Sequence, residues 1–282
     1  MSSFPERLTL LDNPRADRVR RVSGLVGRSA RLRSGLMLVE GPKAVRELAR
    51  FRPGAVRDVY VREDAWDTHA DVVEAARCAT RWVHPVTNEV SAVLSRDSQG
   101  VCAVASHDAL VRELPEPSVG ETLVVLAQGR DPGNVGTIIR TADAFGASGV
   151  ITVAGTVEAT NPKVVRASAG SVFHVPVCVV PSFEEVRFLV HGRGAALLGT
   201  SGGAGSVDLA QMLVQGVSTR SRLSQSHAWV FGNEATGLSG AQMRLCDALV
   251  SIPMSGDAES LNVASAATAC LFASQTVRGM AL

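Results

Sequence analysis

Three glycine-containing segments in the second half of the chain carry polar side chains that could take part in catalysis. They are LAQGRDPGNVGTIIRTADAFGASGV (126–150), WVFGNEATGL (229–238) and SIPMSGDAESLNVASA (251–266), and their polar residues are Asn134, Arg140, Glu234, Ser260 and Asn262. The first segment has neither the G-K-[ST] of a phosphate-binding P-loop nor the G-x-G-x-x-G of a dinucleotide site. Taken alone, each segment is typical of a turn or a helix cap, with Asn134 expected to cap a helix.

A fourth segment matches the nucleophile elbow of a serine hydrolase. GTSGG (199–203) fits G-x-S-x-G directly after a predicted strand, with Ser201 as the nucleophile. The acid and the histidine should follow in that order, as Asp208 and His227 do, but only 26 residues separate Ser201 from His227. This spacing is too short for the intervening elements of such a fold, so the hydrolase is a minor alternative.

The elements that would position these segments alternate between apolar strands and helices. The predicted strands are TLVVLAQ, GVITVA, VPVCVV, GAALLGT, AWVFG and ALVSIP, and the helices between them include VGTIIRTADAFG and SFEEVRFLVHG. Continuous apolar strands of this kind favour an α/β fold with a parallel sheet covered by helices on both faces. The final stretch, SLNVASAATACLFASQTV, is small or apolar nearly all round and predicts a closely packed, buried helix.

The first hundred residues predict a smaller α/β domain. LMLVEG (36–41), AVRDVYV (55–61) and GVCAVAS (100–106) read as strands, and the helices begin at Pro42 and near Asp71. Pro115 and Pro117 then interrupt the periodicity. We therefore predict domains at 1–110 and 121–282, joined by a linker at 111–120.

Positive charge is concentrated at the N-terminus. Residues 1–57 have a net charge of +8 and the remainder −7, within a total of +1. The stretch 16–35 places Val19, Val22, Leu25 and Val26 at helical spacing with arginines opposite, which predicts one amphipathic helix with a basic side. The basic side could be an ordinary solvated face or a surface that binds nucleic-acid phosphates.

Composition excludes several classes of protein. In 282 residues there is no run of 18 apolar residues, and the N-terminus lacks the apolar block of a secretory signal. The five cysteines are widely separated without a C-x-x-C pair. We expect a cytoplasmic protein with reduced thiols, no metal site and no membrane contact.

The three segments together resemble the motifs of the SpoU (TrmH-like) branch of the SPOUT RNA methyltransferases. The resemblance rests on N-V-G-x-x-x-R-T-A (134–142), F-G-N-E-x-x-G-L (231–238), and S-I-P-M-x-G with S-L-N-V-A-S-A (251–266), and it covers 121–282. R-x-x-x-G-L-M-L-V-E-G-P-K-A-V (31–45) and Q-G-V-C-A-V-A (99–105) are similar to the ribosomal-protein-like substrate-binding domain of many members.

This resemblance implies a deep trefoil knot and S-adenosyl-L-methionine as the donor of a methyl group to a ribose 2′-hydroxyl. It implies Arg140 as the residue that acts on the hydroxyl, with Asn134, Glu234, Ser260 and Asn262 as positioning residues. The expected donor-binding residues are Thr200, Gly202, Gly232, Ile252, Pro253, Met254, Leu261 and Val263.

The resemblance further implies a homodimer in which the first motif approaches the partner's donor site. RNA, with 23S ribosomal RNA as the expected substrate, should contact the basic N-terminal residues Arg18, Arg21, Arg28, Arg31, Arg33 and Lys43. A non-catalytic RNA-binding or ribosome-assembly protein on the same fold is the main alternative.

Overall fold

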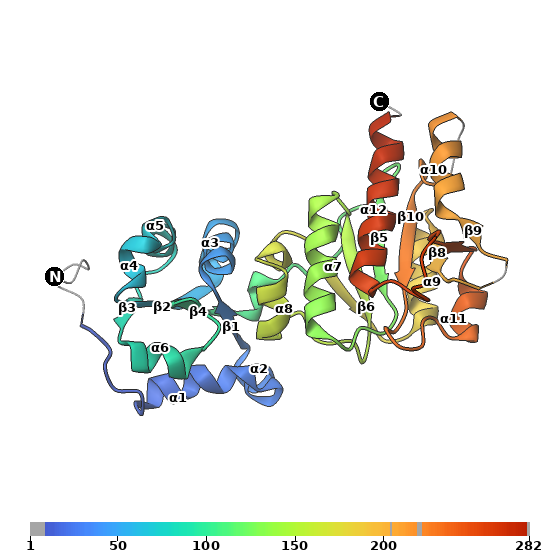
Figure 1. Ribbon diagram of the computed structural model, residues 1–282. Helices are drawn as coiled ribbons and strands as arrows, with labels where there is room; N and C mark the ends of the chain where they lie inside the picture. The colour runs from blue at the N-terminus through green and yellow to red at the C-terminus, as the bar shows by residue number, and fades with distance from the viewer. Residues whose placement is uncertain (1–8, 204, 219–221, 281–282) are drawn as a thin grey trace. The chain divides into compact units, whose positions relative to one another are not determined.

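The computed structural model describes residues 9–203, 205–218 and 222–280, and its internal contacts divide the chain into two compact units (Figure 1). The first unit comprises Met1–Leu110 together with Glu158–His174, and the second comprises Val111–Val157 together with Val175–Leu282. Residues 111–120, which the sequence suggested as a linker, lie in the second unit. The segment Glu158–His174 follows a strand of the second unit but belongs to the first.

A four-stranded mixed sheet forms the centre of the first unit. Its strand order is β1-β4-β2-β3, with β4 antiparallel to both neighbours and β3 parallel to β2. Helices α1 and α6 lie on one face, and α3 and α5 lie on the other (Figure 1). The strands are β1 (Leu36–Glu40), β2 (Val56–Arg62), β3 (Val83–Val86) and β4 (Val101–Ser106), and the helices are α1 (Asp17–Ser23), α2 (Arg28–Ser34), α3 (Pro42–Phe51), α4 (Ala65–Thr68), α5 (Ala70–Ala79), α6 (Asn88–Leu94) and α8 (Pro162–Ala167).

The single amphipathic helix predicted for 16–35 is wrong, because the structure contains two helices there. A short 3-10 turn, Gly24–Val26, and the extended residue Gly27 separate α1 from α2. Glycine has a low helix propensity, so Gly24 and Gly27 interrupt the periodic pattern. Leu25 is buried as predicted, but Val26 is 59% exposed.

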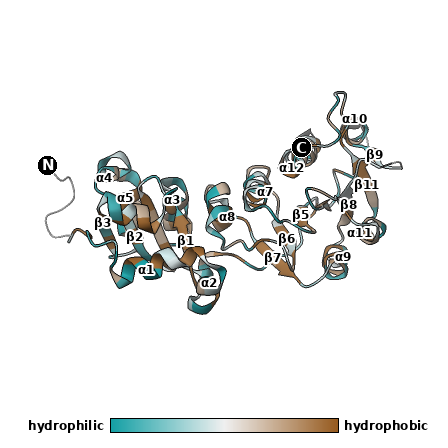
Figure 2. Cartoon of the chain, turned by 60° about the horizontal axis from the view of Figure 1, so that its bottom comes forward, coloured by the Kyte–Doolittle hydropathy of each residue, from teal (hydrophilic) through white to brown (hydrophobic). Residues whose placement is uncertain are grey.

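A seven-stranded, fully parallel sheet forms the second unit, as the apolar strands predicted. Its order is β7-β6-β5-β10-β8-β11-β9. Helices α7 and α12 cover one face and α9 covers the other (Figure 2). The strands are β5 (Thr122–Leu126), β6 (Gly149–Val153), β7 (Val177–Val180), β8 (Ala196–Thr200), β9 (Val207–Asp208), β10 (His227–Phe231) and β11 (Ala248–Ser251), and the helices are α7 (Pro132–Ala144), α9 (Phe183–Gly192), α10 (Leu209–Ser218), α11 (Gly240–Leu245) and α12 (Val263–Met280).

The direction of the strands places all the candidate segments at one edge of this sheet. Because the strands are parallel, the loops that follow β5, β8, β10 and β11 leave from the same edge. Residues 126–150 follow β5, 199–203 follow β8, 232–238 follow β10 and 252–262 follow β11. The carboxyl edge is where open parallel sheets usually bind ligands.

The prediction that the last helix is buried all round is correct for only one of its faces. Ala264, Ala267, Cys270 and Val277 of α12 are almost fully buried, whereas Phe272 is 55% exposed. The ring of Phe272 lies 6.2 Å from that of Phe145, which follows α7. Small residues allow close packing on the inner side of α12, and the sequence pattern does not distinguish this from burial on every side.

Histidine 227 is a buried polar residue in the core of the second unit. Its Nε2 lies 2.8 Å from Ser274 Oγ on α12, and its Nδ1 lies 2.8 Å from the carbonyl oxygen of Gln225. Trp229 Nε1 donates a hydrogen bond of 2.8 Å to the same Ser274 oxygen. Burial lowers the pKa of His227 to about 4.

This position rules out the serine-hydrolase alternative. His227 begins β10, whereas Ser201 follows the end of β8, and the two strands are parallel neighbours. The two side chains therefore lie at opposite edges of the sheet. The Ser201 hydroxyl instead accepts a hydrogen bond of 3.2 Å from Gly203 N.

Membrane-spanning helices and metal-binding clusters are absent from the described part of the chain. Across 9–203, 205–218 and 222–280, no helix is long and apolar enough to cross a membrane. Over the same ranges there is no group of three or more His, Cys, Asp or Glu side chains arranged to hold a metal ion. Cys78, Cys102, Cys178, Cys246 and Cys270 are all free thiols.

Acidification should destabilise the fold through His227. The unfolded histidine takes up a proton near pH 6.5, whereas the folded one does so only near pH 4. Stability that is present above pH 6.5 is therefore lost as the pH falls toward 4. Urea unfolding at pH 7 and pH 5 should show a fall in the free energy of unfolding about 2 kcal/mol larger for the wild type than for His227→Gln. An equal fall in both proteins would contradict this assignment.

Candidate active site

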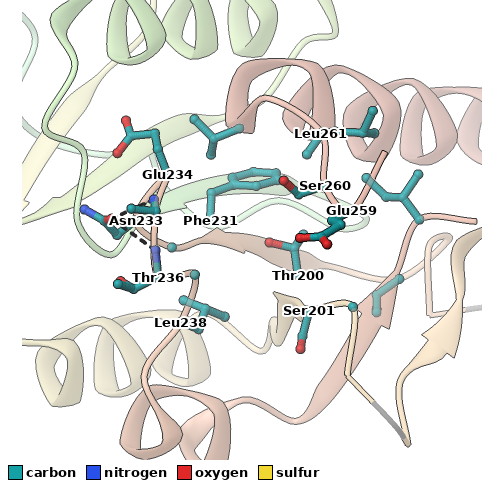
Figure 3. A pocket seen from close by; sticks show the side chains of 18 of the residues that line it. Thr200, Ser201, Phe231, Asn233, Glu234, Thr236, Leu238, Glu259, Ser260 and Leu261 are labelled. Carbon is teal, nitrogen blue, oxygen red and sulfur yellow. Dashed lines mark hydrogen bonds between the residues drawn. The ribbon is translucent and has the colours of Figure 1, made fainter. Parts of the chain in front are cut away.

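A cavity of about 430 Å³ lies at the carboxyl edge of β8, β10 and β11 in the second unit (Figure 3). The lining comes from the loops after these strands and from the start of α12. Among its members are Thr200, Ser201, Gly202, Phe231, Gly232, Asn233, Glu234, Leu238, Met243, Ile252, Met254, Glu259, Ser260, Leu261 and Val263. Segments that are more than 60 residues apart in the sequence thus enclose one space.

The loop after β10 folds back sharply on itself. A Cβ on Gly232 would lie 2.3 Å from the carbonyl carbon of Gly237, so this position has no room for a side chain. Asn233 N donates a hydrogen bond of 3.0 Å to Gly237 O, and Gly237 has a φ of +65°, which favours glycine. The side chain of Asn233 accepts hydrogen bonds from Ala235 N and Thr236 N (dashed lines in Figure 3). These contacts fix the loop as a compact wall of the cavity.

Hydrogen bonds connect the ends of the three strands beneath the cavity. Thr200 Oγ1 donates a hydrogen bond of 2.9 Å to the carbonyl oxygen of Val230 on β10. Ser201 N donates one of 3.0 Å to the carbonyl oxygen of Val250 on β11. Gly199, at the end of β8, is packed so closely that a Cβ would lie 2.8 Å from Cys246 Sγ. The floor is therefore tightly packed, which limits how far the loops can move apart.

Three polar residues predicted from separate motifs meet beside this cavity. Asn262 Nδ2 donates a hydrogen bond of 3.0 Å to Asn134 Oδ1, and Asn134 Nδ2 donates one of 3.4 Å to Glu234 Oε1. Asn262 Oδ1 in turn accepts a hydrogen bond from Ala264 N in the first turn of α12. Asn134 is not the cap of α7, because Asp131 occupies that position and accepts a hydrogen bond from Asn134 N. The Asn134 side chain is thereby free to join the second and third motifs.

Arginine 140 lies away from the cavity of its own chain. It is exposed on α7, does not line the cavity, and forms no hydrogen bond or ion pair within the described parts of the chain. Asn134 lies six residues earlier in the same helix, so the two side chains point in different directions. An unpaired, exposed guanidinium is available to a ligand or to another chain.

The expected donor-binding residues largely coincide with the lining of the cavity. Thr200, Gly202, Gly232, Ile252, Met254, Leu261 and Val263 line it, as do Glu234 and Ser260, whereas Pro253 does not. The sequence reasoning did not select Phe231, Leu238, Met243 or Glu259, which also line it. Phe231 and Leu238 are the first and last residues of the second motif. Their positions in that motif could have indicated that they line the cavity.

The basic residues of the first unit differ in their accessibility. Arg21, Arg33 and Lys43 are exposed, and Arg18 lies 3.5 Å from Asp58. Arg28 forms an ion pair with Glu158.

Arg31 is only 2% exposed, and its guanidinium donates to Glu158 and to the carbonyl oxygens of Leu25 and Val26. Burial tends to raise the pKa of Glu158, but the hydrogen bonds from Arg28 and Arg31 outweigh it and lower this pKa. Because its side chain is buried and its two terminal nitrogens already donate within the unit, Arg31 is excluded from the RNA-contact set that the sequence suggested.

Comparison with known proteins gives the same family that the sequence motifs resemble. Residues 121–272 match the model of the SpoU rRNA Methylase family. The 23S rRNA (guanosine-2′-O-)-methyltransferase RlmB of Bordetella pertussis is 33% identical over 244 residues, which are 84% of this chain and 96% of that protein.

Two solved structures are similar over nearly the whole chain. The SpoU methyltransferase AviRb of Streptomyces viridochromogenes has a TM-score of 0.77 at 29% identity and covers 93% of this chain and 98% of its own. An AdoMet-bound rRNA methyltransferase of Sinorhizobium meliloti has a TM-score of 0.77 at 28% identity, and the match covers 95% of this chain and 97% of that one. With its three motifs assembled around one cavity, this chain belongs to the SpoU rRNA methylase family.

Proposed function

We propose that this protein transfers a methyl group from S-adenosyl-L-methionine to a ribose 2′-hydroxyl of 23S ribosomal RNA. The observation that carries the proposal is the hydrogen-bonded series Asn262, Asn134 and Glu234, which joins all three motifs beside the cavity. The similarity to RlmB, a 23S rRNA (guanosine-2′-O-)-methyltransferase, and to the SpoU methyltransferase AviRb supports the same reaction. Because ribosomal RNA is its expected substrate, we also propose that the protein acts in the cytoplasm.

The cavity has the properties that S-adenosylmethionine requires. Its volume of about 430 Å³ falls within the range of roughly 300–1,000 Å³ that is usual for small-molecule sites. Met254 and Leu261, which are 42% and 43% exposed, offer apolar surface for an adenine, and Glu259 and Ser260 offer polar groups for the ribose or the amino acid part. The bound donor supplies an electrophilic sulfonium methyl group. The absence of a side chain at Gly232 lets backbone groups approach the ligand closely.

A ribose hydroxyl is a weak nucleophile at neutral pH, so the site has to orient it and stabilise the charge that develops on it. An arginine guanidinium is always positively charged in proteins and has no acceptor atom, so it is a poor proton acceptor. We therefore assign Arg140 to contacts with the RNA phosphate and with the developing alkoxide. Asn134 and Asn262 would position the RNA backbone, and Glu234 holds the Asn134 amide.

The active form proposed here is a homodimer. Arg140 does not line the cavity of its own chain, so a second chain is the natural source of the arginine that completes each site. The exposed ring of Phe272 on α12 offers apolar surface for such a contact. The deep trefoil knot expected from the family resemblance would lie in the segments after β8, β10 and β11, which line the cavity.

The first unit would hold the RNA. We retain 1–110 as the substrate-binding domain, 111–120 as the connection and 121–282 as the catalytic domain, and we add Glu158–His174 to the first as an insertion from the second. Arg18, Arg21, Arg28, Arg33 and Lys43 form the proposed phosphate-contact set.

Replacement of Arg140 by alanine should abolish methyl transfer without affecting donor binding. Loss of an electrostatic contact to the reacting oxygen typically lowers the rate about 100-fold or more. Transfer from radiolabelled S-adenosylmethionine to deproteinised ribosomal RNA, followed by nucleoside analysis, measures this loss. Arg244→Ala, which removes an exposed arginine from α11, is the matched control and should keep its activity.

Near-normal turnover in Arg140→Ala would contradict the role assigned to this arginine. A wild-type protein that binds the donor but labels no RNA, free or within ribosomal particles, would favour the non-catalytic alternative.

Replacement of both Arg21 and Arg33 by alanine should weaken RNA binding and reduce its dependence on salt. Each lost phosphate contact lowers the slope of log K against log salt by about 0.7 to 0.9. Fluorescence anisotropy with a labelled ribosomal RNA fragment at several salt concentrations measures the slope, again with Arg244→Ala as control. A slope identical to that of the wild type would refute the phosphate-contact assignment.

A further inference from the structure

An exposed tryptophan of the first unit lies at the end of a column of planar side chains. Trp82 immediately precedes the edge strand β3, and its side chain is 47% exposed. Its ring centroid lies 6.4 Å from that of His84 with an interplanar angle of 21°. His84 in turn stacks on Tyr60 at 5.2 Å, and Tyr60 is buried in the core. The column thus runs from the interior of the sheet to the solvent.

Local hydrogen bonds hold Trp82 in this position. Its carbonyl oxygen accepts a hydrogen bond of 2.9 Å from Val59 N, and its own N donates one of 3.2 Å to Thr80 Oγ1. The Thr80 hydroxyl donates to the carbonyl oxygen of Arg57. These bonds fix the backbone of Trp82, and stacking on His84 orients its exposed indole, so a ligand that binds there has less side-chain entropy to remove.

The surroundings of the exposed indole are cationic. The guanidinium of Arg81 lies over the indole ring, 4.7 Å from its centroid, and a stacking base would take its place on that face. Arg18 on α1 lies 3.5 Å from a carboxylate oxygen of Asp58. The same oxygen lies 2.9 Å from His84 Nε2. Burial raises the pKa of Tyr60 above its usual range, and the charges of Arg18 and Arg21 oppose this rise, so both arginines lie near the phenol.

Two of these three arginines are available to an anionic ligand. Within the ranges that the structure describes, neither Arg21 nor Arg81 forms an ion pair.

We propose that Trp82 is a stacking site for an unpaired nucleobase of the RNA substrate. Single-stranded RNA is commonly bound by an aromatic ring beside arginines, because the ring stacks on a base while the guanidiniums contact phosphates. A protein-docking surface would instead present a continuous apolar patch, and Trp82 is flanked by charged groups. The inference deepens the proposed function and rests on RNA being the ligand of this unit.

The position of the three tryptophans allows a direct test in the full-length protein. Trp66 is 5% exposed and Trp229 is fully buried, so Trp82 is the tryptophan that a ligand in solution can reach. Stacking of a base should quench its emission. Titration with a short single-stranded oligoadenylate RNA should therefore quench the tryptophan emission, and a blunt RNA duplex of equal length should quench it less.

Variants separate stacking from general charge attraction. Trp82→Leu should bind fluorescein-labelled oligoadenylate about tenfold more weakly, and Trp82→Tyr should restore most of the affinity. Because stacking releases no counterions, the slope of log K against log salt should stay that of the wild type. Leu32→Ala, which removes a 61% exposed apolar side chain from α2, is the matched control and should bind normally. Circular dichroism and donor binding verify that each variant is folded.

The inference would be overturned if Trp82→Leu kept the wild-type affinity for oligoadenylate, or if Trp82→Tyr did not restore the affinity that Trp82→Leu loses. This result would not touch the proposed function, which is measured separately as labelling of ribosomal RNA. Quenching by single-stranded RNA together with the loss in Trp82→Leu would support the inference even in a preparation that methylates no RNA.

Discussion

The backbone contact between Gly232 and Gly237 is the constraint on which the cavity depends. The chain leaves β10 and returns within five residues, so closely that a Cβ on Gly232 would lie 2.3 Å from the Gly237 carbonyl carbon. Backbone atoms cannot move aside as a flexible side chain can. The tight return carries Glu234 toward Asn134 and directs Leu238 into the core, where it is 6% exposed.

The parallel sheet brings this loop together with the other loops that form the site. Because β5, β8, β10 and β11 point the same way, the loops that follow them meet at one edge, and hydrogen bonds from Thr200 and Ser201 fasten neighbouring strand ends. The series Asn262, Asn134 and Glu234 then links the loops above the floor. In the proposed reaction the cavity holds the donor and these amides guide the RNA backbone, while Arg140 has to be supplied by a second chain.

The strands and the main helices could be predicted from the sequence, because apolar runs and glycine-rich turns are local signals. The meeting of the three motifs was implied by the family resemblance. Contacts between residues far apart in the sequence could not be predicted from such local signals. Arg31 has the same local pattern as the exposed arginines, yet it is buried against Glu158, which lies 127 residues later. The outer face of α12 with Phe272, and the choice of Asp131 over Asn134 as a helix cap, depend equally on contacts that a periodic pattern does not encode.

The most direct test of this account is the affinity for S-adenosylmethionine, measured by calorimetry on Gly232→Ala and on the control Gly240→Ala. A Cβ on Gly240 would meet only Arg244 at an ordinary 3.5 Å, so this variant should bind as the wild type does. The account predicts that Gly232→Ala, although folded by circular dichroism, loses binding by a large factor. Wild-type affinity in Gly232→Ala would contradict the claim that this backbone contact shapes the donor site.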